Sequence, residues 1–216
     1  EMLSRLELSA DQLQSCLEYA HKLNIDFVVT PYDPLTAQEM YDIGVVNFKT
    51  ASADLSDIHL HDKLRSFDFQ QLYIATGMSN ISMVQRTLDS YFAFQAAKIN
   101  IFHCVSDYPC SDESINLACM DTLTTDFDGY GRVGYSDHSI DFLPAIIALS
   151  RGYTLFERHF TLDKNDEGPD HEASSNPSEF KYYIDQLKRV SRILGDKTKK
   201  VQLCEMEMSR NSKKSL

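Results

Sequence analysis

Two histidines lie at equivalent positions in the chain, each at or near the end of a short apolar stretch. His138 ends the stretch Arg132–His138, and His159, 21 residues later, lies in the stretch Thr154–Phe160. If these stretches are neighbouring strands about 4.8 Å apart, the two imidazoles can bind one metal ion. Asp170 follows in the next loop and can add a carboxylate. The spacing also fits two unrelated histidines at the beginnings of loops.

A lysine interrupts another apolar stretch. Lys49 follows Val45–Phe48, and a buried ammonium group is costly unless its charge meets an anion or a carboxylate. Lys49 is therefore a candidate for anion binding, with catalysis as a Schiff-base lysine as the rival functional interpretation. In the third interpretation Lys49 has no function. Its aliphatic stem then lies along the apolar surface while its ammonium group reaches water.

Other reactive side chains are less specific. His59 and His61 have the spacing of metal ligands, but they lie in a polar stretch and are expected at the surface. Cys104 lies in the stretch His103–Tyr108 and is expected to be a small buried side chain rather than a nucleophile. Five cysteines without a CxxC pair predict reduced thiols, and we therefore expect a cytoplasmic protein.

The elements that must position these residues follow from the hydrophobic pattern, which alternates between short strand-like and longer helix-like stretches. Helix starts are predicted at Ser9–Gln12, at Ser82–Gln85 and at Asn176–Glu179, and Gly195 is expected to end the last helix. The expected strands begin on average about 25 residues apart, the length of one βα repeat. They are Phe27–Thr30, Val45–Thr50, Leu72–Thr76, Ile99–Val105, Arg132–His138 and Thr154–Phe160.

Strands that alternate with helices predict a parallel α/β sheet. An open dinucleotide-binding sheet should carry GxGxxG directly after its first strand, and no such motif follows the first expected strand, Phe27–Thr30. The one match to the pattern, at 129–134, instead leads into the fifth expected strand. A closed (β/α)8 TIM barrel uses about 250 residues. We therefore expect an incomplete TIM barrel over residues 1–196, with about six βα units and its first two strands missing. Residues 197–216 are expected to form a connector.

The net charge of −11 argues against nucleic acid or an anionic membrane as the main partner, because both require a basic surface. The longest apolar run, Ala145–Leu149, is too short to span a membrane. A small phosphorylated substrate remains compatible, since a few local cations or a metal ion can bind it.

Several segments resemble the catalytic domain of the sialic acid synthase family, which includes N-acetylneuraminate, legionaminate and pseudaminate synthases. Two blocks are specific, namely GYSDH at 134–138 and ERHFTLD at 157–163 followed by GPDH at 168–171. FVVTP at 27–31, FKTASAD at 48–54, ATGM at 75–78 and HCVSDYP at 103–109 occur in the family order.

The resemblance implies a TIM barrel that condenses phosphoenolpyruvate with N-acetylmannosamine or a related amino sugar to a nine-carbon 2-keto acid. It implies a divalent metal ion, manganese or magnesium, and a homodimer of the full-length parent protein. Carried over by position, the metal ligands are His138 and His159. The catalytic residues are Asp54, Asp170 and Lys49, and the phosphoenolpyruvate contacts are Thr30, Lys49, Ser52, Tyr108 and Ser136.

The sequence departs from the family pattern at several positions. Ala75 stands where serine is more frequent, Ser106 where asparagine is common, and Asp54 where glutamate also occurs. The family's first two βα units, which carry a glutamate and a second lysine, and its C-terminal antifreeze-like domain have no counterpart here, so we expect this chain to be inactive alone. The alternatives are another metal- or Schiff-base-dependent aldolase barrel and a non-catalytic sugar-binding relative.

Overall fold

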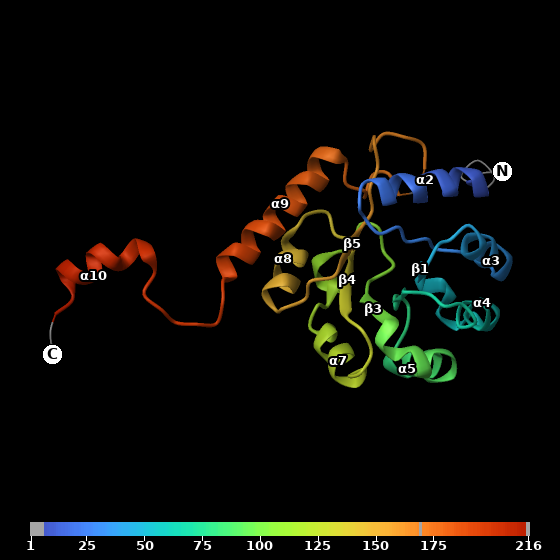
Figure 1. Cartoon of the computed structure of the whole chain (residues 1–216), viewed down its shortest axis with the longest axis horizontal. Coiled ribbons are helices and arrows are strands. Elements are labelled where there is room, and N and C mark those ends of the chain that lie inside the picture. Colours follow the sequence, from blue (N-terminus) through green and yellow to red (C-terminus); the bar gives the residue numbers. More distant parts are fainter. Residues whose placement is uncertain (1–6, 169, 215–216) are drawn as a thin grey trace.

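The computed structural model describes residues 7–168 and 170–214, and over these residues the chain forms a parallel five-stranded sheet. Each strand is hydrogen-bonded to the next one in the chain, with helical segments between them. The sheet curls into a half-barrel whose outer side carries the helices (Figure 1). The strands are β1 (Asn47–Thr50), β2 (Gln71–Ala75), β3 (Ile99–His103), β4 (Val133–Asp137) and β5 (Phe156–Arg158).

The first expected strand contributes a single bridge instead of a full strand. The Val29 N–H donates to the Asn47 carbonyl at 3.2 Å, and the Lys49 N–H donates to the Val29 carbonyl at 2.9 Å. Pro31 follows two residues later and has no N–H to continue such a ladder. The expected six strands are therefore five strands and one bridge beside β1.

The helical segments complete the βα repeat. The α-helices are α2 (Ala10–Lys22), α3 (Pro34–Asp42), α4 (Ile58–Leu64), α5 (Ile81–Thr87), α6 (Asp112–Ile115), α7 (Cys119–Asp126), α8 (Leu143–Ser150), α9 (Pro177–Leu194) and α10 (Met206–Ser212). Shorter 3-10 or π segments are η1 (Ser52–Ser56), η2 (Leu88–Phe92), η3 (Ala93–Lys98) and η4 (Leu203–Glu205). Beyond α9 the chain leads away from the sheet, and α10 lies apart from it (Figure 1).

Two of the predicted helix starts are confirmed, and one is displaced. Ser9 with Gln12, and Asn176 with Glu179, form reciprocal capping boxes at α2 and α9. For α5 the cap is Asn80, whose side chain accepts the Met83 N–H at 3.0 Å, so the expected start at Ser82 is wrong. The Ser82 hydroxyl instead donates to the Asn80 side chain. An asparagine two residues earlier can cap equally well, which the local pattern did not resolve.

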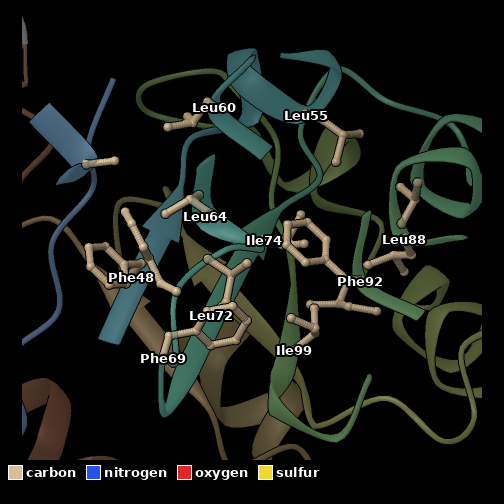
Figure 2. Packing of buried hydrophobic residues seen from close by; sticks show 14 of the residues in the cluster. Phe48, Leu55, Leu60, Leu64, Phe69, Leu72, Ile74, Leu88, Phe92 and Ile99 are labelled. Atoms are coloured by element: carbon tan, nitrogen blue, oxygen red, sulfur yellow. The ribbon is translucent and has the colours of Figure 1, made fainter. Parts of the chain in front are cut away.

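The main core lies between the outer face of the sheet and the helices that cover it. Phe48, Leu72 and Ile74 of the strands are fully buried against Leu60 and Leu64 of α4 (Figure 2). Burying each such side chain stabilises the fold by about 1.5–3 kcal/mol. Because strand side chains alternate, this packing aims Lys49, Ala75 and their equivalents at the inner side of the curl.

His61 is part of this core, so its expected surface position is wrong, whereas His59 is exposed as expected. The His61 ring lies 5.4 Å from the Tyr91 ring and 5.5 Å from the Phe92 ring, measured between centroids. Neither ring nitrogen has a hydrogen-bond partner among the described residues. Burial lowers its pKa to about 4, so the ring is a neutral histidine within the core.

Two further predictions concern cysteines and membrane spans. Within the described residues all five cysteines are free thiols, and Cys104 is buried as expected. The same part of the chain contains no helix that is long and apolar enough to cross a bilayer.

Candidate active site

A cavity of about 430 Å³ opens on the inner side of the curled sheet, where the carboxyl ends of the strands meet. It brings together eight of the nine residues singled out from the sequence, all except Asp54. Those eight are Thr30, Lys49, Ser52, Tyr108, Ser136, His138, His159 and Asp170. They come from segments up to 140 residues apart, so the fold and not local sequence creates the cluster.

The two predicted metal ligands lie side by side in this cavity. The centroids of the His138 and His159 rings are 5.2 Å apart, and the rings are inclined by 75°. This follows from the register, because β4 and β5 pair so that Asp137 lies beside Arg158 and one histidine follows each. The Tyr108 ring lies against both, with centroid distances of 4.2 and 5.2 Å.

One tautomer of His138 is fixed by its surroundings. Its Nδ1 lies 2.6 Å from the Val105 carbonyl oxygen, which can only accept a hydrogen bond. Nδ1 must therefore carry the proton, and burial lowers the pKa of the ring, which favours the neutral form. The lone pair is then on Nε2, 3.3 Å from the Ser136 hydroxyl. In this tautomer the Ser136 hydroxyl donates to Nε2. A carbonyl on one nitrogen and an accepting lone pair on the other is the usual arrangement of a metal-ligating histidine.

The residues present fit a divalent metal ion with two protein ligands. Bonds of about 2 Å to one ion require two rings as close as these. Asp170 is near, with its Oδ2 3.9 Å from His159 Nδ1. Within residues 7–168 and 170–214, however, no group of three or more histidine, cysteine or acidic side chains is arranged to hold a metal. The fit is thus to an open site, in which water or substrate fills the other positions.

Lys49 forms an ion pair with Glu157, whose Oε1 lies 3.3 Å from the lysine Nζ. An ammonium held by a carboxylate is a poor nucleophile, so this contact favours anion binding over Schiff-base chemistry. Glu157 was given no role from the sequence, although strand alternation places it on the same face as His159. Its Oε2 is buried without a hydrogen-bond partner among the described residues.

Three small side chains form a cradle around Gly77. The Gly77 N–H donates to the Ser52 hydroxyl at 3.0 Å, and that hydroxyl is 3.2 Å from the Cys104 sulfur. A methyl group on Gly77 would lie 2.4 Å from the Ser106 hydroxyl and 2.7 Å from the Ser52 hydroxyl. Two hydroxyls in close array, one of them fixed by a backbone N–H, suit the oxygens of an anion. Ser106 has no predicted role, and its place three residues beyond the end of β3 is the signal that could have found it.

Asp54 lies in η1, next to the cavity-lining Ala53, but does not itself line the cavity. Burial and the nearby Asp57 raise the pKa of its carboxyl group, and its Oδ2 is buried without a partner among the described residues. Its catalytic role stays a prediction.

Of the GPDH block, Pro169 lies outside the described residues.

Known proteins resemble this chain in sequence and in fold. The model of the NeuB family matches residues 1–199. The chain belongs to the NeuB family. The relatives of this NeuB chain include an uncharacterised protein of Methanocaldococcus jannaschii, 35% identical over 195 residues, which cover 90% of this chain and 57% of that protein.

Other NeuB relatives are named as synthases. The N,N'-diacetyllegionaminic acid synthase of Campylobacter jejuni is 31% identical over all of this chain and 64% of its own length. A crystal structure of N-acetylneuraminic acid synthetase from Leptospira borgpetersenii, in complex with citrate, superposes with a TM-score of 0.82 at 29% identity. That alignment covers 95% of this chain and 72% of the other. The NeuB chain spans about three fifths of the length of these two curated relatives.

Proposed function

We propose that this NeuB chain binds phosphoenolpyruvate and a divalent metal ion as part of a synthase that forms nine-carbon 2-keto sugar acids. The second substrate is N-acetylmannosamine or a related amino sugar. The observation that carries the proposal is the single cavity in which a histidine pair, an ion-paired lysine and a hydroxyl cradle face one another. Relatives named as legionaminic, pseudaminic and N-acetylneuraminate-9-phosphate synthases support the reaction class.

Phosphoenolpyruvate is an anion, and the protein's own groups are suited to holding one despite the net charge of −11. Lys49 supplies a local positive charge, and the Gly77 cradle supplies hydroxyl groups. Burial raises the pKa of the Tyr108 hydroxyl above its usual value of 10, so it remains a hydrogen-bond donor. On binding, the phosphate or carboxylate of the substrate competes with Glu157 for the Lys49 ammonium.

After this competition Glu157 is left with a free carboxylate at the cavity wall. Together with Asp170 it stabilises positive charge that develops on the former enol carbon as the new carbon–carbon bond forms. Water then adds to that carbon, and phosphate leaves by C–O cleavage, which yields the 2-keto group. The protons carried by Lys49 and Tyr108 remain at Nζ and at the phenol oxygen, where they hold substrate oxygens. The roles of Thr30 and Ser136 are further hydrogen bonds to the same substrate.

His138 and His159 are the residues proposed to hold manganese or magnesium. The chemistry that such an ion would supply is Lewis-acid polarisation of the sugar's aldehyde group, whose carbon is attacked by the weakly nucleophilic enol carbon. The two histidine rings orient the reaction, because they fix where the aldehyde can lie relative to the Gly77 cradle.

The remaining expectations belong to the same proposal. The half-barrel is part of an incomplete TIM barrel, and residues 197–214 of the described chain serve as a connector to another domain. The parent protein is a cytoplasmic homodimer whose partners are its two substrates rather than nucleic acid or a membrane.

The experiment measures phosphate release from phosphoenolpyruvate with N-acetylmannosamine and manganese, using a chain extended to the length of its relatives. We expect turnover that falls at least 100-fold in His159→Ala and in the presence of chelator. Turnover unchanged by both would contradict the proposal. For the 216-residue chain without the extension, the corresponding test is calorimetric measurement of phosphoenolpyruvate binding.

A further inference from the structure

The arginine of the ERHFTLD block lies on the outer side of the sheet, opposite the catalytic cavity. The Arg158 side chain is 6% exposed and forms an ion pair of 3.0 Å with Asp137, whose side chain is fully buried. A second cavity, of about 310 Å³, lies beside the guanidinium. An arginine at the edge of a cavity could bind an anion there. The role of Arg158 therefore depends on which groups its N–H donors contact.

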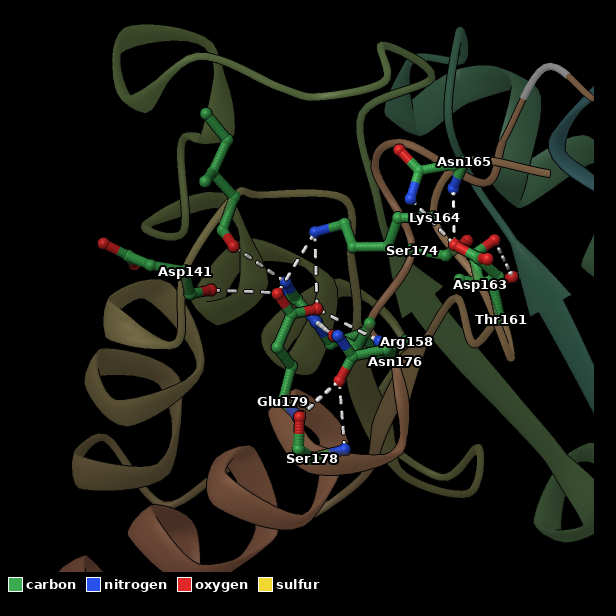
Figure 3. A network of polar contacts seen from close by, with 12 residues as sticks. Asp141, Arg158, Thr161, Asp163, Lys164, Asn165, Ser174, Asn176, Ser178 and Glu179 are labelled. Atoms are coloured by element: carbon green, nitrogen blue, oxygen red, sulfur yellow. Dashed lines mark hydrogen bonds and ion pairs between the residues drawn. The ribbon is translucent and has the colours of Figure 1, made fainter.

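Four hydrogen bonds and one ion pair hold the Arg158 guanidinium inside the protein. Nε donates to the Ser175 hydroxyl at 2.6 Å. Nη1 contacts Asp137 at 3.0 Å and the Asp141 carbonyl at 3.3 Å, and Nη2 donates to the Ser139 and Ile140 carbonyls at 3.0 and 3.1 Å. Figure 3 shows Arg158 among these contacts, between Asp141 and the beginning of α9. The guanidinium therefore binds groups of the protein itself.

These contacts link the two segments that carry the histidines. His138 lies between Asp137, which forms the ion pair with Arg158, and Ser139, whose carbonyl accepts from Arg158 Nη2. The Ser139 N–H and hydroxyl also donate to Asp137, at 3.0 and 2.6 Å. On the other side, the Ser175 N–H donates to the His159 carbonyl at 2.9 Å. The Arg158 guanidinium therefore links Asp137 and Ser139, which flank His138, to Ser175, which is bonded to the His159 carbonyl.

We infer that Arg158 is a positioning residue that holds the His138 and His159 rings in one place for a shared ligand, through its bonds to both segments. The inference rests on the proposed function for the identity of that ligand, a divalent metal ion. The planar fork of arginine is required, because a lysine ammonium in the same place can reach only three acceptors and cannot satisfy both segments. Outer partners of metal ligands commonly affect metal affinity 10- to 100-fold.

The test compares Arg158→Lys and Asp137→Asn with the wild-type chain. Ile99→Val is the matched control, since Ile99 is fully buried in the core at the beginning of β3 and touches neither histidine segment. The first readout needs no metal: nuclear Overhauser contacts between the two imidazole rings. The second is manganese affinity, and thermal unfolding verifies that each variant is folded.

We expect the ring-to-ring contacts to be lost in Arg158→Lys and weakened in Asp137→Asn, and manganese affinity to fall 10- to 100-fold, while Ile99→Val changes neither. Persistent ring contacts and wild-type manganese affinity in a folded Arg158→Lys would overturn the inference. If the wild-type chain shows the ring contacts but binds no manganese, and Arg158→Lys loses them, the positioning role stands and the proposed metal function fails.

Discussion

Replacing Gly77 by alanine tests the hydroxyl cradle directly. Ordinary contact begins at about 3.4 Å, so the new methyl group would force the Ser106 hydroxyl back by about 1.0 Å and the Ser52 hydroxyl by about 0.7 Å. Overpacking of this kind costs about 1–3 kcal/mol of stability. For a chain of this size that lowers the melting temperature by roughly 2–12 °C.

The larger effect is expected on phosphoenolpyruvate. The Ser52 hydroxyl would also lose the Gly77 N–H, which now fixes it at 3.0 Å. One lost hydrogen bond to a charged substrate costs about 1.5–3 kcal/mol, which weakens binding roughly 10- to 150-fold. Calorimetric titration with phosphoenolpyruvate measures this loss.

Gly129→Ala is the control for that experiment. Gly129 has a φ of 96° and nothing within 4 Å of the added methyl group, so the change strains the backbone without touching the cavity. We expect a lower melting temperature and unchanged substrate affinity. The reasoning about the cradle is refuted if folded Gly77→Ala binds phosphoenolpyruvate within twofold of the wild type.

Further predictions concern Lys49 and His61. Lys49→Met is expected to weaken phosphoenolpyruvate binding at least 10-fold by calorimetry, and borohydride with pyruvate should leave no adduct on wild-type Lys49; an adduct would favour the Schiff-base alternative. His61 has a pKa of about 4 in the folded chain and 6.5 as the reference value, so the unfolded chain binds the proton more readily and stability falls as the pH drops. Between pH 7 and pH 4 this costs about 3 kcal/mol, and urea unfolding of His61→Leu should show a pH dependence smaller by that amount. Equal pH dependence in variant and wild type would show that His61 is not the group responsible.

The sequence was sufficient for the parts of the site that depend on strand alternation and on repeat length. His138 and His159 were expected to end neighbouring strands, and the parallel register of β4 and β5 brings their rings to 5.2 Å. Lys49 was expected to meet a carboxylate or an anion, and Glu157 is that carboxylate.

Long-range packing decided what the sequence could not. The polar neighbours of His61 suggested a surface position, but aromatic rings from η2, 30 residues further along the chain, enclose it. Likewise, nothing local indicates that the Arg158 donors are satisfied by a loop 19 residues earlier and by Ser175. Such contacts depend on how whole elements pack, which a local pattern does not encode.

The central claim is that two imidazoles bind one divalent ion, and manganese binding followed by electron paramagnetic resonance tests it most directly. The wild-type chain is expected to bind one manganese ion, and saturation at 100 times the dissociation constant should stabilise it by about 2.7 kcal/mol. His138→Ala and His159→Ala should each abolish both effects, whereas His59→Ala, at an exposed position, should change neither. Manganese affinity that survives the loss of either His138 or His159 would contradict the account.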